Sequence, residues 1–145
     1  MIAMTVPDAL RDRQDGAMAL HWEHVTVDAR DAAALAAFWA EALGWGVAPG
    51  ATAEVAVIGG PSRPRDTPGW LFLQVPEGKT AKNRMHVDLQ ADDLDAETDR
   101  LVGLGAALLH EKREWGAHWR SLTDPEGNEI CVVQAPPPEA GNEGA

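Results

Sequence analysis

The sequence has one cysteine, no tyrosine and few basic residues, and these shortages exclude several classes of protein. A single cysteine, Cys131, cannot form an internal disulfide, so the chain is not a disulfide-stabilised scaffold and fits a reducing compartment. Twelve lysines and arginines against 23 acidic residues give a net charge of −11, which argues against nucleic acid or an anionic membrane as a partner. No apolar run approaches the roughly 20 residues that span a bilayer, and we see no signal-peptide pattern, so we expect a cytoplasmic protein.

The length of 145 residues corresponds to one domain that is large enough to fold alone. Residues 1–19 have mixed charges without a period, and we expect a flexible leader there. Residues 136–145 are rich in proline, glycine and alanine and have little to bury, so we expect a disordered tail. The six tryptophans are a high number for this length, and tryptophan often lines pockets for flat or apolar ligands.

The middle of the chain contains an internal repeat. Segment 22–29 resembles segment 84–91 when His24 is aligned with His86, and each segment is followed by an acidic helix start, a helix and a Leu-Gly stop. We therefore predict two units, 20–76 and 83–135. A histidine at the same place in both units suggests a functional site built by pseudo-symmetry.

Each unit has the pattern strand, helix, strands. Asp31 is a plausible N-cap of the first helix and Gly44 a plausible stop, and the sequence of residues 124–128 is typical of a tight turn between the last two strands. The predicted helices are 31–43 and 93–103, and the predicted strands are 21–28, 45–48, 53–58, 70–75, 84–91, 106–111, 117–123 and 128–134.

Strand side chains alternate between two faces, and the two faces of these strands differ in chemistry. One face is aliphatic and suits packing against helices. The other face mixes ionisable and aromatic residues, a combination that is rare on a solvent-exposed sheet face. This combination indicates a sheet curled around a cavity. The residues assigned to this second face include Trp22, His24, Trp70, Phe72, Gln74, His86, Asp88, Glu129 and Cys131.

Segments 24–45, 79–89 and 124–132 resemble the glyoxalase/bleomycin-resistance domains of the vicinal oxygen chelate superfamily. They are most similar to a glyoxalase-like subgroup that is common in high-GC bacteria, and the resemblance covers roughly residues 20–135. It implies an α+β fold in which two βαβββ units form a curled, cup-like mixed sheet with the helices outside. It also implies a homodimer, and it leaves open whether the cup forms within one chain or across two.

Catalytic members of this superfamily hold a divalent metal in the cup, and the resemblance places its ligands on His24, Gln74, His86 and Glu129. Two histidines and a carboxylate suit iron, manganese, nickel, cobalt or zinc and leave positions open for a substrate. Gln74 is either a fourth ligand or an orienting group.

Other residues are weaker candidates for roles in the cup. Asp88 and Glu129 are candidate catalytic carboxylates, with Asp88 either a base or a partner of the histidines. His110 and His118 are expected at the surface or at a sheet edge. The residues expected to bind a substrate are Trp22, Trp70, Phe72, Arg84, Trp115 and Trp119.

These observations favour a metal-dependent enzyme that acts on a small organic molecule by isomerase or lyase chemistry. Ring-cleaving dioxygenases of the superfamily commonly place a tyrosine near the metal, and this chain has none. The alternative is a non-catalytic protein that binds a small molecule or drug, as bleomycin-resistance proteins do, and the acidic charge and the tryptophans fit that alternative. A third hypothesis is a regulatory domain that holds a metabolite.

Overall fold

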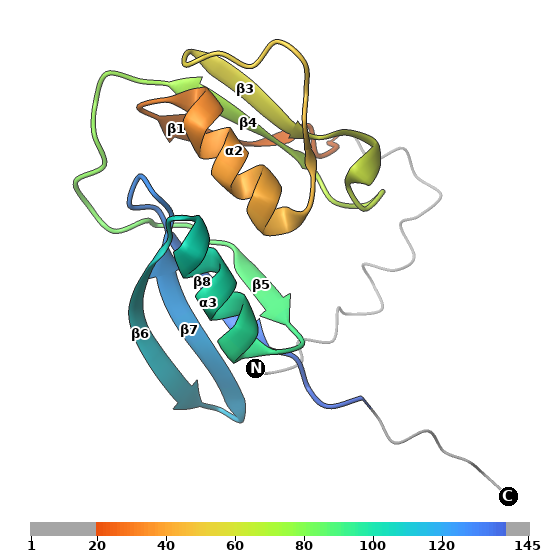
Figure 1. The fold of residues 1–145 in the computed structure, drawn as a ribbon, viewed down its shortest axis with the longest axis vertical. Helices are drawn as coiled ribbons and strands as arrows, with labels where there is room; N and C mark the ends of the chain where they lie inside the picture. The colour runs from red at the N-terminus through yellow and green to blue at the C-terminus, as the bar shows by residue number, and fades with distance from the viewer. Residues whose placement is uncertain (1–19, 139–145) are drawn as a thin grey trace, which may run out of the picture.

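The computed structural model describes residues 20–138, which fold as two βαβββ units (Figure 1). The expected leader, 1–19, and most of the expected tail lie outside the described residues. The first unit consists of β1 (His24–Ala29), α2 (Ala32–Leu43), β2 (Gly46–Val47), β3 (Val55–Gly59), the short 3-10 helix η1 (Gly60–Ser62) and β4 (Gly69–Gln74).

The second unit repeats this order with β5 (Asp88–Ala91), α3 (Leu94–Leu104), β6 (Ala107–Glu114), β7 (Ala117–Thr123) and β8 (Glu129–Gln134). The strand orders are β1-β4-β3-β2 and β5-β8-β7-β6, so the sequence repeat is also a repeat of topology. In each sheet the first and last strands of the unit pair in parallel, and the other pairs are antiparallel. The predicted α+β fold of two pseudo-symmetric units is confirmed.

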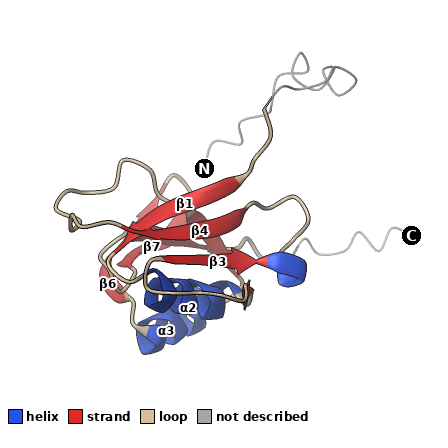
Figure 2. Ribbon diagram, turned by 90° about the horizontal axis from the view of Figure 1, so that it is seen from above, coloured by secondary structure: helices blue, strands red, loops and turns tan. Residues whose placement is uncertain are grey.

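The two helices cover one side of the sheets and leave the other side open (Figure 2). Helix α2 packs on β3 and β4 of its own unit, α3 packs on β6, β7 and β8, and the two helices touch each other. The core between helices and sheets is a single cluster that includes Leu35, Trp39, Phe72 and Leu122. No helix among residues 20–138 is long and apolar enough to span a membrane.

Both helices begin and end with the signals expected from the sequence. Asp31 accepts a hydrogen bond from the Ala34 N–H at 3.0 Å, and Asp93 accepts one from the Ala96 N–H at 3.0 Å. Each carboxylate therefore satisfies a backbone donor that the helix leaves unpaired. Gly44 ends α2 with a φ of 69°, a left-handed conformation that favours glycine.

The structure corrects the predicted facing of strand 70–75. Val25 pairs with Trp70 and Val27 with Phe72 in the parallel β1–β4 register, which puts both aromatic side chains on the helix side of the sheet. There they are buried, and Trp70 lies 4.5 Å from Trp39 between ring centroids. The physical reason is volume, because the alanine-rich inner surface of α2 leaves room for large rings against the sheet.

Element bounds differ most in the second unit. The predicted strand 84–91 is paired only from Asp88 onward, so His86 lies in the extended segment that leads into β5. Strand β6 extends to Glu114, further than predicted, because it pairs with β7 along a long hairpin.

The two units are joined by buried and capping hydrogen bonds. The Trp39 indole N–H of α2 donates to the Asp124 carboxylate at 3.0 Å, and both residues are buried. The Arg100 guanidinium of α3 donates to the Glu41 and Ala42 carbonyls at the end of α2 at 3.2 and 2.8 Å. The units are thus held together by specific contacts as well as by the shared core.

Candidate functional site

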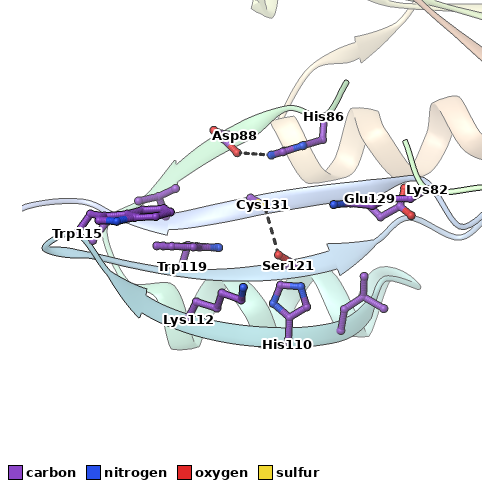
Figure 3. Close-up of a pocket in the computed structure, with 13 residues that line it drawn as sticks. Lys82, His86, Asp88, His110, Lys112, Trp115, Trp119, Ser121, Glu129 and Cys131 are labelled. Atoms are coloured by element: carbon purple, nitrogen blue, oxygen red, sulfur yellow. Dashed lines mark hydrogen bonds and ion pairs between the residues drawn. The ribbon is translucent and has the colours of Figure 1, made fainter. Parts of the chain in front are cut away.

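The second sheet forms a cup on the face turned away from α3, with a cavity of about 610 Å³ (Figure 3). Trp115 and Trp119 lie at one end of this cup and Lys82 and Glu129 at the other. The face is set by strand alternation, because Ile130 and Val132 of β8 point into the core while the residues between and beside them point into the cup. The full set of lining residues comes from the second unit and the segment before it.

A cluster of three reactive side chains occupies the middle of the cup. Asp88 pairs with Cys131 in the parallel β5–β8 register, so the two side chains lie next to each other on one face. His86 lies two residues before Asp88, and its Nε2 is 3.2 Å from an Asp88 carboxylate oxygen. The ligand atoms of His86, Asp88 and Cys131 all lie within 4.8 Å of one another. Cys131 also contacts Ser121, with 3.3 Å between Sγ and Oγ.

The aromatic end of the cup is formed by the β6–β7 hairpin. Trp115 has a φ of 51° and Gly116 a φ of 74°, which together make the tight turn of the hairpin. The Trp115 and Trp119 rings are stacked, with centroids 6.1 Å apart and an interplanar angle of 13°. Because Trp115 is largely exposed, the pair offers a flat apolar surface at the mouth of the cup.

Glu129 is already bound by the protein itself. Lys79 Nζ lies 3.1 Å from Oε1, and the Asn83 N–H donates to Oε2 at 3.0 Å. Burial opposes ionisation of this carboxyl, but the hydrogen bonds from Asn83 and Lys79 outweigh it, so the pKa of Glu129 is lowered from its usual 4.5. Both oxygens face donors of the preceding loop, which is a structural arrangement for holding segment 79–83 against β8.

Of the four ligands implied by the family resemblance, His86 alone belongs to the cluster of close ligand atoms found among the described residues. His24 begins β1 of the first sheet, whereas His86 lies in the segment that leads into β5 of the second sheet. Gln74 pairs with the buried Ala29, on the opposite face of its sheet from His24, and its amide donates to the Arg30 carbonyl at 2.8 Å. Glu129 contacts Lys79 and Asn83, and the four-ligand set implied by the resemblance stays a prediction.

The substrate-binding candidates are divided among three places. Trp115 and Trp119 line the cup as expected. Trp70 and Phe72 are core residues, as described above, and do not reach it. Trp22 and Arg84 are exposed and do not line this cavity.

Several lining residues were not singled out from the sequence. His110 and Lys112 of β6 line the cup, although we expected His110 at the surface or an edge. His110 pairs with Ser121 and Lys112 with Trp119, so both share the face of the reactive cluster. The available signal was the alternation of residues 108–112 across a hairpin from 117–123, but a bulge between Leu108 and His110 shifts that register.

The sequence model of the glyoxalase-like domain family matches residues 24–133, which is most of the chain. The chain belongs to the glyoxalase-like domain family. A search of curated proteins finds no significant match. The family assignment agrees with the two βαβββ units and the cup, and it establishes the glyoxalase/bleomycin-resistance/dioxygenase superfamily that the sequence motifs indicated.

Solved structures with this fold include proteins with different activities. A lactoylglutathione lyase from Agrobacterium tumefaciens has 19% identity and a TM-score of 0.56, covering 82% of this chain and 96% of its own. A fosfomycin resistance protein from Mesorhizobium loti has 13% identity and a TM-score of 0.61, covering 83% and 96%. A bleomycin-binding protein solved with bleomycin has 21% identity and a TM-score of 0.55, covering 81% and 100%. At these identities the likeness is one of fold alone.

Proposed function

We propose that this protein is a glyoxalase-like enzyme that acts on a small organic molecule in the cup by an isomerase- or lyase-type proton transfer. The observation that carries the proposal is that two histidines, His86 and His110, line the same cavity from strands on opposite sides of Ser121 and Cys131. Two proton-carrying groups around one substrate are what enolisation of a carbonyl compound requires.

The two histidines would divide the work. The Asp88 carboxylate lies 3.2 Å from His86 Nε2, close enough to pair with that nitrogen and orient the imidazole. The other ring nitrogen of His86 donates to the carbonyl oxygen of the substrate and stabilises the negative charge that develops there. His110 takes the proton from the neighbouring carbon. A divalent metal held by His86 would supply the same polarisation as a Lewis acid, in place of the His86 imidazole.

The walls of the cup define the class of substrate. The stacked Trp115 and Trp119 suit a flat or apolar part of the molecule, and Lys82 and Lys112 suit a carboxylate or another anionic group. Two lysines in one cup are notable in a chain with a net charge of −11. We therefore propose small 2-oxo or 2-hydroxy acids with an apolar substituent as the first compounds to test.

The proposal is tested by proton exchange. A panel of such acids is incubated with the protein in deuterated water, and loss of the proton next to the carbonyl is followed by NMR. We expect exchange with the wild type and a rate lower by about 100-fold or more in His86→Ala and His110→Ala. His118→Ala is the matched control, because His118 contacts Glu111 and does not line the cup. Equal exchange in all four proteins would overturn the assignment.

The second candidate is a binding protein without catalysis, and the stacked tryptophans at the mouth of the cup favour it. The structural similarity to a bleomycin-binding protein points to the same alternative. Quenching of tryptophan fluorescence by a compound that undergoes no exchange, lost in Trp119→Ala, would support this function over the enzymatic one.

We also propose that the protein is a cytoplasmic homodimer, as the resemblance and the single cysteine suggested. Exposed apolar side chains on the open face of the first sheet support the dimer. Val55 of β3 and Leu73 of β4 are register partners on this face, and both are exposed. A second copy of the chain would cover these apolar side chains.

A further inference from the structure

We infer that His86, Asp88 and Cys131 form a binding site for a thiophilic divalent cation of the zinc type, with a ligand set that differs from the one the family resemblance implies. The three ligand atoms lie within 4.8 Å of one another in the middle of the cup. Donor atoms around a tetrahedral zinc ion are about 3.5 Å apart, so the cluster needs only a small contraction to enclose an ion.

The backbone holds these three residues in place. Cys131 and Asp88 are register partners in the β5–β8 pair, and the Cys131 N–H donates to the Val87 carbonyl at 3.1 Å. Val87 lies between His86 and Asp88, so its hydrogen bond anchors the segment that carries both. Strand alternation then turns the His86 and Asp88 side chains to the same side as the thiol. The His86 and Asp88 side chains are exposed, which leaves them room to adjust around an ion.

The chemistry of the donors selects the kind of ion. A thiolate, an imidazole and a carboxylate together favour zinc and its substitutes cobalt and cadmium over magnesium or calcium, which prefer oxygen ligands. Three protein ligands would leave a fourth coordination position for water or a substrate oxygen. Glu129 is the less suitable ligand, because Lys79 and Asn83 already bind both of its oxygens.

The site is tested with cobalt(II) added to the full chain, purified without a histidine tag. We expect one cobalt per chain and a near-ultraviolet absorption band from thiolate-to-cobalt charge transfer. Cys131→Ser should lose that band, and His86→Ala and Asp88→Asn should weaken cobalt binding by about 10- to 100-fold. Glu129→Gln should keep the band and the affinity, as should the control His118→Ala, and thermal unfolding of each variant checks that it is folded.

Two results would overturn this inference. One is a wild type without the charge-transfer band at saturating cobalt. The other is cobalt binding that is unchanged in Cys131→Ser but lost in Glu129→Gln. That result would support the ligand set implied by the family resemblance instead. The cobalt experiment measures metal binding and not turnover, so its outcome is independent of the proton-exchange assay. Cobalt binding without proton exchange would support the cation site and contradict only the proposed enzymatic function.

Discussion

At the scale of single residues, the interpretation of Glu129 changes once its neighbours in the fold are known. The family resemblance and its position on the last strand made it a candidate metal ligand and catalytic carboxylate. The structure surrounds it with the Lys79 ammonium and the Asn83 N–H, and its side chain is only 19% exposed. A carboxylate with both oxygens paired to donors contributes to stability whatever its role in the cup.

This pairing predicts a pH-dependent contribution to stability. The pKa of Glu129 is lowered in the folded protein, so its contribution is present above the usual pKa of 4.5 and is lost as the pH falls through the lowered value. We expect Glu129→Gln to reduce the free energy of unfolding by about 1 kcal/mol at pH 7 and by less at pH 3 to 4. Urea unfolding at several pH values measures the difference.

Lys79→Met supplies the control for this prediction, because it removes the other charge of the pair. The double variant should lose less free energy of unfolding than the sum of the losses of the two single variants. Its loss should be close to that of either single variant. A difference between wild type and Glu129→Gln that stays constant from pH 3 to 7 would contradict the assignment of the lowered pKa.

At the scale of elements, the two helices demonstrate what local sequence determines well. Both start at an aspartate whose side chain accepts from the N–H three residues later, and both stop at a glycine after a leucine. These signals depend on contacts within a few residues, so they could be read without the fold. The repeated Leu-Gly stops also extended the alignment of the two units, which starts from His24 and His86.

The caps can be tested individually. Asp31→Ala and Asp93→Ala each remove one acceptor from a helix N-terminus, and we expect each to lower the free energy of unfolding by about 1 kcal/mol. The exposed Asp92, next to the second cap, is the matched control, and its change to alanine should cost less than about 0.5 kcal/mol. Chemical unfolding measures all three, and equal values for Asp92→Ala and Asp93→Ala would show that the cap does not contribute.

At the scale of the whole molecule, Asp124 connects the two units. Its carboxylate accepts from the Trp39 indole of the first unit and from three donors of its own turn, the Glu126 N–H and the Asn128 backbone and side chain. Asp124 and Trp39 are both buried, so the Trp39 N–H has no water to replace this acceptor, whereas the donors of the turn are part-buried. The turn that was predicted as a simple hairpin loop is therefore also part of the interface between the units.

Removing this acceptor should destabilise the entire fold. We expect Asp124→Ala to lower the free energy of unfolding by about 3 kcal/mol, because it removes the acceptor of the buried Trp39 N–H and of three part-buried donors of the turn. Trp39→Phe removes a single donor and part of the buried ring, so it separates the link between units from the rest of the turn. Urea unfolding followed by far-ultraviolet circular dichroism measures both, and a loss below about 1 kcal/mol for Asp124→Ala would contradict this role.

The proposed dimer gives a second prediction at this scale. Leu73→Glu places a charge on the open face of the first sheet and should shift the molar mass measured by light scattering from dimer toward monomer. Val102→Glu is the control, because Val102 is exposed on helix α3, away from that face. A wild type that is monomeric at high concentration, or a dimer unaffected by Leu73→Glu, would contradict the proposal.

The sequence alone determined the features that depend on short-range order. The repeat, the helix caps, the turn at 124–128 and the family motifs all follow from neighbouring residues, and they were enough to predict the α+β fold of two units. Strand alternation placed His86, Asp88 and Glu129 on the cup face, and Trp115 and Trp119 were expected as pocket walls from their residue type. All five line the cup in the structure.

Only the tertiary structure decided which residues meet. Alternation says that Trp70 and Phe72 share a face but not which face, and the space left by the small side chains of α2 turned them into the core. Pairing between distant strands decided that Gln74 lies away from the histidines, while Cys131 lies beside Asp88. These outcomes depend on packing volume and on long-range register, which no local pattern contains.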